Sequence, residues 1–539
     1  MPDREYLDYG LSSTSEVLLT SEAGDQVARK DNVAFEHETD RRVRVLIRPD
    51  VLKQTLSGIG TSFTEASAFV LAHLDEAERL TVMRNIFGEA GANFSMARTP
   101  IGSTDFSVEG HYSYADETDD ETLASFSVAV DKDGFNASKY PGIKDESFDL
   151  LPMIKEALAI KAEQADPQLR IVASAWTAPP WMKDIEDWYV KMSPENDYQG
   201  TGGTLKPEHA QTYANYLARY LEAYEAEGVN LWGLTPVNEP EGNSGSWESM
   251  HFTAESQNDF IKNQLGPTLE ARGHGEIKLL MYDHNRPHLE EWADVILGDP
   301  DTAKYVHGVA VHWYASTFKV YEEALEAVHE RFPGSSIIHT EGTIDALGTD
   351  APAGVTDPVR FKESGWFDND GFWWNANATD WAYSATWAEH PEDHPIYTPV
   401  HRYARNIIVS LNNWVEGWVD WNIVLDQGGG PNHVANFCGA PIMIDTESGY
   451  VYYTPIYHVL KQLSRTIRPG DRAVQATTEL GPLDDDALHA SASINDAGLL
   501  SVQLLNTTKE AIEYALEVGA QSAPVTIPAN SVQTVRVQL

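Results

Sequence analysis

Apolar strand-like segments and segments with helical periodicity alternate through the middle of this chain. The strand-like segments are residues 57–64, 93–101, 169–176, 231–238, 277–283, 306–314, 335–341 and 415–425. Helical patterns lie between them and after the last one, at residues 66–87, 151–165, 207–228, 253–273, 288–297, 320–332, 398–412 and 454–467. A strand followed by a helix eight times is typical of a (β/α)₈ barrel, because parallel strands need a crossover connection. The sequence therefore predicts an α/β fold with a TIM barrel over residues 55–467.

Both ends of the chain contain short segments in which apolar and polar residues alternate. Such segments follow the barrel at residues 487–494, 499–506, 511–518 and 525–539, and another precedes it at residues 43–48. This pattern predicts a β-sandwich. We expect residues 1–54 and 468–539 to build it together. Few aromatic residues mark a sugar-binding face there, which favours a structural brace over a carbohydrate-binding module.

The balance of charges excludes one class of partner. The chain has 38 basic and 82 acidic residues, a formal net charge of −44. Such a surface repels phosphate backbones, so we expect no nucleic-acid partner. Adaptation to a salty medium explains the acidity better than an ordinary acidic surface does, because salt screens the self-repulsion. The single cysteine, Cys438, excludes disulfides within the chain and thiolate metal sites, and we interpret it as a buried structural thiol.

No part of the sequence is typical of a membrane or export segment. No apolar run reaches the ~18 residues that a transmembrane helix needs. The first residues lack the basic and apolar regions of a signal peptide. We therefore expect a cytoplasmic location, or a secreted protein if the sequence is a mature form.

Polar and aromatic residues gather where the predicted strands end, which is where a barrel of this kind holds its active site. The strand at 231–238 ends in Asn238 and Glu239, because Pro240 cannot continue a β-ladder. Glu341 ends the strand at 335–341. The other strand ends supply further polar side chains and rings: Arg98, Asp105, Trp176, Asp283, His284, Asn285, Tyr314, Trp421 and Asn422. Together these residue types predict a pocket for a sugar.

Glu239 and Glu341 are the candidate catalytic pair. They lie on the fourth and seventh predicted strands, so they face each other across the barrel mouth. Glycosidic cleavage needs one neutral carboxyl to protonate the leaving group and one carboxylate to stabilise the sugar cation. A gap of about 5–5.5 Å between the carboxyl groups means retention of configuration, and about 6.5–9.5 Å means inversion.

Several of these residues also have a purely structural interpretation. Arg98 could pair with a barrel carboxylate, and beside Glu341 it would hold that group ionised. Asp105 could cap a loop, and Trp176 and Trp421 could only pack. We interpret His312 as a residue that supports the site by hydrogen bonding.

No cofactor or metal is predicted at this site. The first strand lacks the His-x-His pattern of metal-dependent hydrolase barrels. The run Gly428-Gly-Gly430 is not followed by Lys-Ser/Thr, which argues against a phosphate-binding loop.

The chain resembles glycoside hydrolase family 30, in particular its glucosylceramidase-like branch. The longest matching motif is Tyr305-Val-His-Gly-Val-Ala-Val-His-Trp-Tyr314, and Thr235-Pro-Val-Asn-Glu-Pro240 is another. The remaining matches run in family order along the barrel, at residues 58–67, 98–107, 173–181, 340–342, 417–422 and 429–432.

This resemblance implies a retaining β-glycosidase with a barrel and a sandwich built from both chain ends. It implies that Glu239 is the acid/base and Glu341 the nucleophile. It also implies that the residues holding the glucose at the non-reducing end are Asp105, Trp176, Asn238 and Trp421. By the same motifs, Tyr314 lies beside the nucleophile and Asn436 lines the pocket. Asn285 stands where animal members have a glutamine.

Two segments depart from the family pattern. The loop at 241–251 is shorter, which leaves Trp247 as an aromatic wall of the pocket. The segment between Glu341 and Trp421 is longer, and its stretch at 366–387 holds five of the 15 tryptophans, namely Trp366, Trp373, Trp374, Trp381 and Trp387. These rings either form subsites for a leaving group or pin the insertion onto the barrel.

The resemblance leaves the substrate open. The leading interpretation is hydrolysis of a β-glucoside, whether an oligosaccharide or a glycolipid. The alternative within the family is a β-1,6-glucanase. A catalytically silent sugar-binding protein is the alternative from another class, and the presence of both glutamates argues against it.

Overall fold

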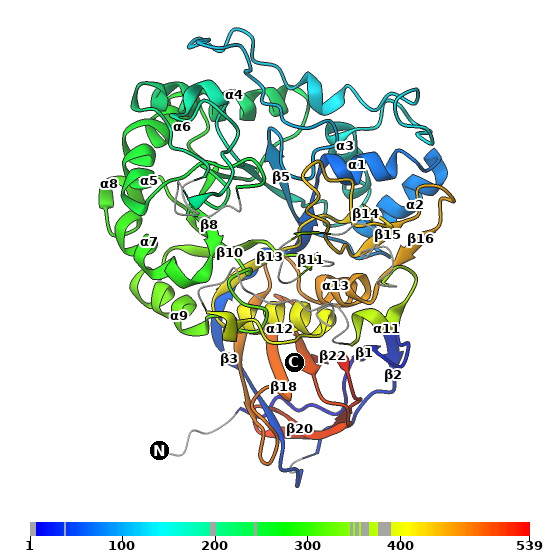
Figure 1. The fold of residues 1–539 in the computed structure, drawn as a ribbon. Coiled ribbons are helices and arrows are strands. Elements are labelled where there is room, and N and C mark those ends of the chain that lie inside the picture. Colours follow the sequence, from blue (N-terminus) through cyan, green and yellow to red (C-terminus); the bar gives the residue numbers. More distant parts are fainter. Residues whose placement is uncertain are drawn as a thin grey trace.

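A closed eight-stranded parallel barrel forms the larger part of the computed structural model (Figure 1). The structure describes residues 7–36, 39–194, 201–241, 245–344, 349–350, 355–356, 366–375 and 390–539. The barrel strands are β4 (Gly58–Ser62), β5 (Met96–Ile101), β6 (Arg170–Ala175), β7 (Gly233–Thr235), β8 (Lys278–Asn285), β9 (Gly308–His312), β10 (Ser336–Glu341) and β13 (Val415–Val419). Parallel pairing of β13 with β4 closes the ring, so the predicted TIM barrel is confirmed.

Side chains fill the barrel interior. Six fully buried apolar residues from different strands contact one another there: Met96, Val172, Leu280, Ala310, Ile338 and Val419. The barrel is therefore a packed core, and open space for a substrate is left only at its ends.

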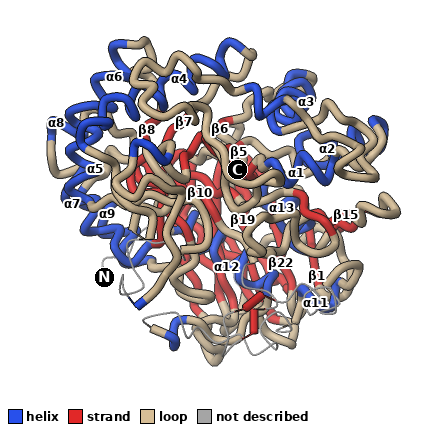
Figure 2. Tube along the Cα trace, turned by 45° about the horizontal axis from the view of Figure 1, so that its top comes forward, coloured by secondary structure: helices blue, strands red, loops and turns tan. Residues whose placement is uncertain are grey.

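Helices surround the barrel strands, as the outer ring in Figure 2 shows. They are α1 (Glu65–Leu71), α2 (Glu76–Phe87), α3 (Leu150–Ala162), α4 (Ala210–Ala226), α5 (Ala254–Phe260), α6 (Gly266–Ala271), α7 (Leu289–Ile296), α8 (Pro300–Ala303), α9 (Glu322–Arg331), α12 (Pro399–Asn412) and α13 (Pro455–Thr466). The predicted helix at 66–87 is two helices, because Asp75 forms a capping box that begins α2. The predicted helix at 253–273 contains a π-helical turn, Ile261–Leu265. One residue separates this turn from Pro267, which has no N–H to donate to an α-helical bond.

The eighth predicted strand, 415–425, is shorter than expected. It divides into β13 and β14 (Val424–Asp426), because Asn422 adopts a left-handed conformation with φ of 66°. β14 belongs to a separate small sheet with β15 (Ile442–Ile444) and β16 (Val451–Tyr453).

Both chain ends build a second, nine-stranded sheet. Its order is β2-β1-β22-β19-β18-β17-β3-β20-β21. The strands are β1 (Glu16–Ser21), β2 (Ala28–Lys30), β3 (Arg44–Thr55), β17 (Arg472–Glu479), β18 (Leu488–Ile494), β19 (Leu499–Asn506), β20 (Ile512–Val518), β21 (Gln521–Ile527) and β22 (Ser531–Gln538). It has its own apolar core, and α12 and α13 lie between it and the barrel (Figure 1).

Three of the five tryptophans in the long insertion are packed into the protein. Trp366, Trp373 and Trp374 are buried, and Trp366 stacks on Trp373 with ring centroids 5.7 Å apart. In α11 (Asp370–Trp373), the indole N–H of Trp373 donates to the carbonyl of Trp366. These three rings therefore pin the insertion in place. Trp381 and Trp387 lie outside the described residues. Within the described part of the chain, no helix is long and apolar enough to cross a membrane.

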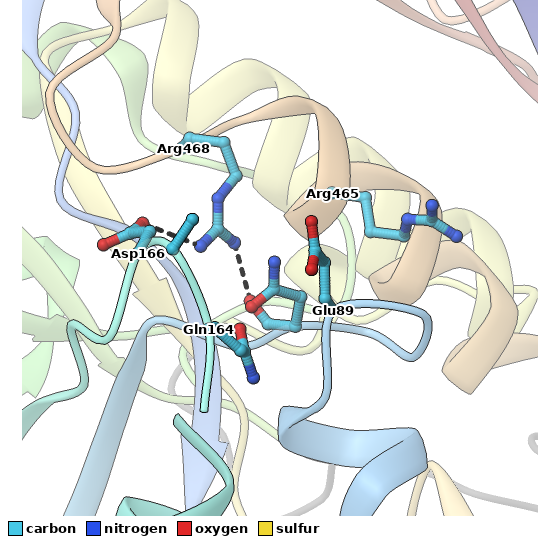
Figure 3. Close-up of a pocket in the computed structure, with 7 residues that line it drawn as sticks. Glu89, Gln164, Asp166, Arg465 and Arg468 are labelled. Carbon is cyan, nitrogen blue, oxygen red and sulfur yellow. Dashed lines mark hydrogen bonds and ion pairs between the residues drawn. The ribbon is translucent and has the colours of Figure 1, made fainter. Parts of the chain in front are cut away.

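A small pocket lies beside the ends of the barrel opposite the predicted site (Figure 3). Its lining includes Asn93, which precedes β5, and Gln164, which follows α3. Arg468 donates there to Asp166 over 3.1 Å and to the carbonyl of Asn93 over 2.6 Å. Arg468 thus joins segments at the end of the barrel that supports stability and not catalysis.

Candidate active site

Glu239 follows β7 at the carboxyl end of the barrel. The backbone N–H of Asn238 donates to the carbonyl of Ala175, and the N–H of Glu239 donates to the carbonyl of Asp283. Glu239 has a φ of 45°, which is uncommon for a residue with a side chain. These hydrogen bonds to β6 and β8, the strands on either side of β7, hold the conformation in place. Backbone strain of this kind is typical of functional sites.

β-bulges direct two other carboxylates into the same space. The register of β10 with β9 shifts between His339 and Glu341, and that of β8 with β9 shifts between Tyr282 and His284. An extra residue reverses the normal alternation of side chains along a strand. Thr340 and Glu341 therefore both serve the pocket, and Thr340 donates its hydroxyl to Asp283 over 2.6 Å.

The two candidate catalytic glutamates lie close together. One side-chain N or O atom from each of Glu239, His312 and Glu341 lies within 4.8 Å of the other two. Tyr314 donates its hydroxyl to Oε1 of Glu341 over 2.9 Å, and Arg98 contacts Oε2. Burial raises the pKa of Glu341, and the charges of His312 and Arg98 oppose that rise.

Arg98 connects the strand ends beneath the pocket. Its guanidinium is fully buried and donates to Asp283 over 2.8 Å and to the amide oxygen of Asn238 over 2.7 Å. Ser174 and Thr235 also donate to Asp283. Burial opposes a charge on Asp283, but Arg98 and His312 hold its pKa well below its usual range. The cluster is therefore a set of compensated buried charges.

His312 bridges two carboxylates. Its Nδ1 lies 2.9 Å from Glu239 and its Nε2 lies 2.9 Å from Asp283. Burial opposes a charge on His312, but the carboxylates of Glu341 and Asp283 outweigh it and raise its pKa to about 9. Burial likewise disfavours a charge on Glu239, but the imidazoles of His284 and His312 outweigh it and lower its pKa to about 2. In the free protein, the proton of this pair therefore resides on His312.

Asp105 and two indole rings form another wall of the pocket. Asn436 donates to Oδ2 of Asp105 over 2.8 Å. Trp176 stacks on Trp421 with ring centroids 5.0 Å apart, and the guanidinium of Arg98 lies 4.7 Å from the Trp176 ring. Burial raises the pKa of Asp105 to about 8, although Asn436 opposes the rise. The wall thus combines a carboxyl and an amide with apolar ring surface, as sugar pockets do.

Asn285, the last residue of β8, contacts a residue of this site. The amide oxygen of Asn285 accepts the backbone N–H of Tyr314 over 2.7 Å, so Asn285 holds the tyrosine beside Glu341. Trp247 is half-buried on the loop after β7. Its contact with substrate stays a prediction.

Sequence patterns did not reveal the hydroxyl groups that support the site. Ser174, Thr235 and Thr340 converge on Asp283 from three strands. Their positions at the end of a strand or one residue before it were the available signal, but only the barrel closure shows that they share one acceptor. A second cluster, His111, Glu248 and His433, has no recognisable spacing in the sequence.

Comparisons with known proteins agree with this geometry. The chain matches the glycosyl hydrolase family 30 TIM-barrel domain over residues 56–357 and 377–467, and the beta sandwich domain of that family over residues 474–535. It is 28% identical to the lysosomal acid glucosylceramidase of Mus musculus, over 91% of this chain and 80% of that protein. It is 26% identical to an endo-1,6-beta-D-glucanase of Neurospora crassa, over 88% of this chain and 83% of that protein.

A solved structure extends the likeness to the whole fold. The crystal structure of SrfJ from Salmonella typhimurium superimposes with a TM-score of 0.77 at 22% identity and covers 98% of this chain and 100% of that one. Both family domains are thus matched in sequence, and the strand ends of the barrel carry a close pair of glutamates. The chain belongs to glycosyl hydrolase family 30 and is an O-glycosyl hydrolase.

Proposed function

We propose that this chain hydrolyses β-glucosides with retention of configuration, using Glu341 as nucleophile and Glu239 as acid/base. The observation that carries the proposal is the proximity of the two carboxylates, whose candidate oxygen atoms lie within 4.8 Å of each other. Inverting enzymes separate these groups by about 6.5–9.5 Å to hold a water molecule between them. One oxygen of each glutamate within 4.8 Å of the other fits the closer spacing of retaining enzymes, about 5–5.5 Å between carboxyl groups, and supports direct attack by a carboxylate on the sugar.

Glu341 is equipped to attack the anomeric carbon. Arg98 contacts one carboxylate oxygen and Tyr314 donates to the other. Both donors favour the ionised form and hold the carboxylate in one orientation. Attack forms a covalent glycosyl ester as the bond to the leaving group breaks. A water molecule then releases the sugar and regenerates Glu341.

The proton for the leaving group resides in the hydrogen bond between His312 and Glu239. Nδ1 of His312 lies 2.9 Å from Oε1 of Glu239, so the proton can pass to the glutamate while both side chains stay in place. Glu239 then protonates the departing oxygen in the first step. In the second step it accepts a proton from the attacking water, and Asp283 keeps the imidazole oriented through Nε2.

The wall formed by Asp105, Trp176, Trp421 and Asn436 supports glucose as the sugar that is transferred. A carboxyl can accept hydrogen bonds from two neighbouring hydroxyl groups, and indole faces suit the C–H surface of a sugar ring. Arg98 donates to the amide oxygen of Asn238 and so fixes its side chain, which we expect to bind the hydroxyl next to the anomeric carbon. The glucosylceramidase among the relatives agrees with this substrate class.

A β-1,6-glucanase is the second candidate, because the Neurospora crassa relative acts on that linkage according to its name. Both candidates share the proposed chemistry and differ only in what leaves. Product analysis on gentio-oligosaccharides, laminarin fragments and glucosylceramide distinguishes them. Release of glucose from glucosylceramide supports the first candidate, and cleavage of gentio-oligosaccharides alone supports the second.

The roles of the glutamates are tested with an activated 2-fluoro-glucoside. We expect this reagent to label Glu341, and mass spectrometry of a proteolytic digest identifies the residue. Glu341→Gln should abolish turnover of aryl β-glucosides. Glu239→Gln should slow substrates with poor leaving groups far more than activated ones, since protonation is what Glu239 supplies. Labelling of another carboxylate, or an equal loss on both kinds of substrate, contradicts the assignment.

A further inference from the structure

A second group of ionisable side chains lies at the same end of the barrel, outside the catalytic pair. It consists of His111 from the loop after β5, Glu248 from the loop after β7 and His433 from the loop after β14. One side-chain N or O atom of each lies within 4.8 Å of the others. Nδ1 of His111 is 2.8 Å from Oε1 of Glu248, and Nε2 of His433 is 3.5 Å from the same oxygen.

The hydrogen bonding of His433 determines which of its two ring nitrogens carries the proton. The other nitrogen directs a lone pair at the carboxylate of Glu248. Nδ1 lies 3.0 Å from the backbone carbonyl of Ser107, and a carbonyl can only accept, so Nδ1 carries the proton. Neutral His433 therefore directs the lone pair of Nε2 at the carboxylate of Glu248. Two acceptors that face each other need a cation between them. An imidazole that donates its other N–H to a backbone carbonyl is the usual arrangement of a metal-ligating histidine.

One oxygen of the Glu248 carboxylate lacks a hydrogen bond, although His111, His433 and Ser103 lie around this side chain. The side chain is fully buried, and its Oε2 has no hydrogen-bond partner among the described residues. Within the same part of the chain, its only ion-pair partners are the two imidazoles. The nearby Lys183 donates to three backbone carbonyls, those of Trp188, Gly202 and Ser249, each over 2.9 Å. A buried carboxylate oxygen without a hydrogen bond is uncommon, so Oε2 of Glu248 calls for a further partner.

We propose that His111, Glu248 and His433 bind a divalent transition-metal ion of the Zn²⁺ class. Two imidazoles and a carboxylate form a common zinc ligand set, and tetrahedral bonds of about 2.0–2.2 Å place donor atoms about 3.4 Å apart. The separations of 2.8 Å and 3.5 Å bracket that value. Hard ions such as Ca²⁺ and Mg²⁺ prefer oxygen ligands, so they fit this site poorly.

The surroundings of the cluster suit a metal site that can be loaded from solvent. The ring of His111 stacks on Trp188 at 5.4 Å, which fixes its plane, and its side chain keeps 29% of its surface exposed. The rings of His111 and His433 stand at 90° to each other. A metal ion from solvent would enter on the side of His111, and Glu248 and His433 form the buried side of the site.

The ion would tie together three loops that surround the sugar pocket. The backbone N–H of His433 donates to the carbonyl of Asp105, over 3.2 Å, and the neighbouring Asn432 lies in the same loop as Asn436. Binding of the ion would therefore stabilise the wall of the pocket next to Asp105. It would take no part in the bond cleavage at Glu239 and Glu341.

Metal binding is tested with the full-length chain after treatment with a chelator. We expect calorimetric titration with Zn²⁺ to give one tight site per chain, and Co²⁺ to give the visible absorption of a tetrahedral complex. Zn²⁺ should also raise the thermal unfolding midpoint. His111→Gln, Glu248→Gln and His433→Gln should each weaken Zn²⁺ binding about 100-fold or more and remove the thermal shift. His111 is partly exposed, so its variant carries the test if substitution of buried Glu248 prevents folding.

Two control variants locate the ion. His489→Gln removes an imidazole of β18 that lies 2.8 Å from Asp486, far in sequence from the proposed site, and the variant should bind Zn²⁺ like the wild type. Glu341→Gln alters the catalytic cluster and should also retain the site. Absence of stoichiometric binding, or binding that is lost in Glu341→Gln and kept in His111→Gln and His433→Gln, overturns the proposal. If stoichiometric binding is absent, the cluster is an ion pair between a protonated histidine and Glu248.

Discussion

The hydroxyl of Tyr314 donates a hydrogen bond of 2.9 Å to Oε1 of Glu341. The tyrosine follows β9, the glutamate ends β10, and Asn285 at the end of β8 holds the tyrosine backbone. Three adjacent strands therefore fix the orientation of one carboxylate oxygen. Arg98 contacts the other oxygen, so the proposed nucleophile has a donor on each side.

Tyr314→Phe should lower kcat for aryl β-glucosides by about 10- to 100-fold, because a hydrogen bond to a charged group contributes about 1.5–3 kcal/mol. Steady-state kinetics measure the effect. The matched control is Tyr514→Phe in the nine-stranded sheet, which removes a buried hydroxyl that donates to Gln533, also over 2.9 Å. It should leave kcat unchanged. Equal kcat values for wild type and Tyr314→Phe would show that the bond does not assist the nucleophile.

The pH profile should depend on His312. Its pKa is raised to about 9, so it carries the proton below that pH and loses it as the pH rises through that value. We expect kcat/KM of the wild type to fall above about pH 9, and this basic limb to move to lower pH in His312→Gln, where Glu239 itself must hold the proton. The variant should also be slowest on poor leaving groups. His307→Gln, at the amino-terminal end of β9, should keep the limb. A basic limb that stays at about pH 9 in His312→Gln excludes the proposed proton source.

Replacement of Arg98 should damage stability as well as activity. Arg98→Met leaves the buried carboxylates of Asp283 and Glu341 without their guanidinium, which should lower the free energy of unfolding by about 3–5 kcal/mol. Arg98→Lys should recover little, because an ammonium group cannot reproduce the planar set of donors. Denaturant unfolding provides the measurement. Arg84→Met, which removes a solvent-exposed pair with Glu163, should have little effect on stability. Wild-type stability of Arg98→Met would contradict a role for Arg98 in compensating these charges.

Asp131 should make stability depend on pH. It is buried and accepts hydrogen bonds from Tyr224 over 2.7 Å and Tyr114 over 2.8 Å, and burial raises its pKa from 3.8 to about 7. The folded state then holds a proton that the unfolded state releases between these values. Its contribution to stability is present below the unfolded pKa and is lost as the pH rises through the folded pKa.

Asp131→Asn should therefore be more stable relative to the wild type at about pH 8 than at about pH 5. Unfolding in urea at both pH values measures the difference. Asp484→Asn, at an exposed position, should show no such trend. A difference between wild type and Asp131→Asn that does not change with pH would assign the proton to another group.

Local periodicity determined the architecture. The alternation of strand and helix patterns predicted the barrel, and the strand endings placed Glu239 and Glu341 at one face, because both signals depend only on neighbours in sequence. Local patterns predicted the chain ends less completely, because they did not indicate β1, β2 and β17. These three strands are short or partly polar, and pairing with neighbouring strands of the nine-stranded sheet stabilises them.

Only the tertiary structure decided how the side chains combine. The β-bulges before Glu341 and Asp283, and the bridge of His312 between Glu239 and Asp283, depend on the register between strands. Arg98 meets Glu341 from a position 243 residues away. His111, Glu248 and His433 converge from three loops that share no spacing rule. Such contacts follow from closure of the barrel, which brings distant residues together and leaves no periodic trace in the chain.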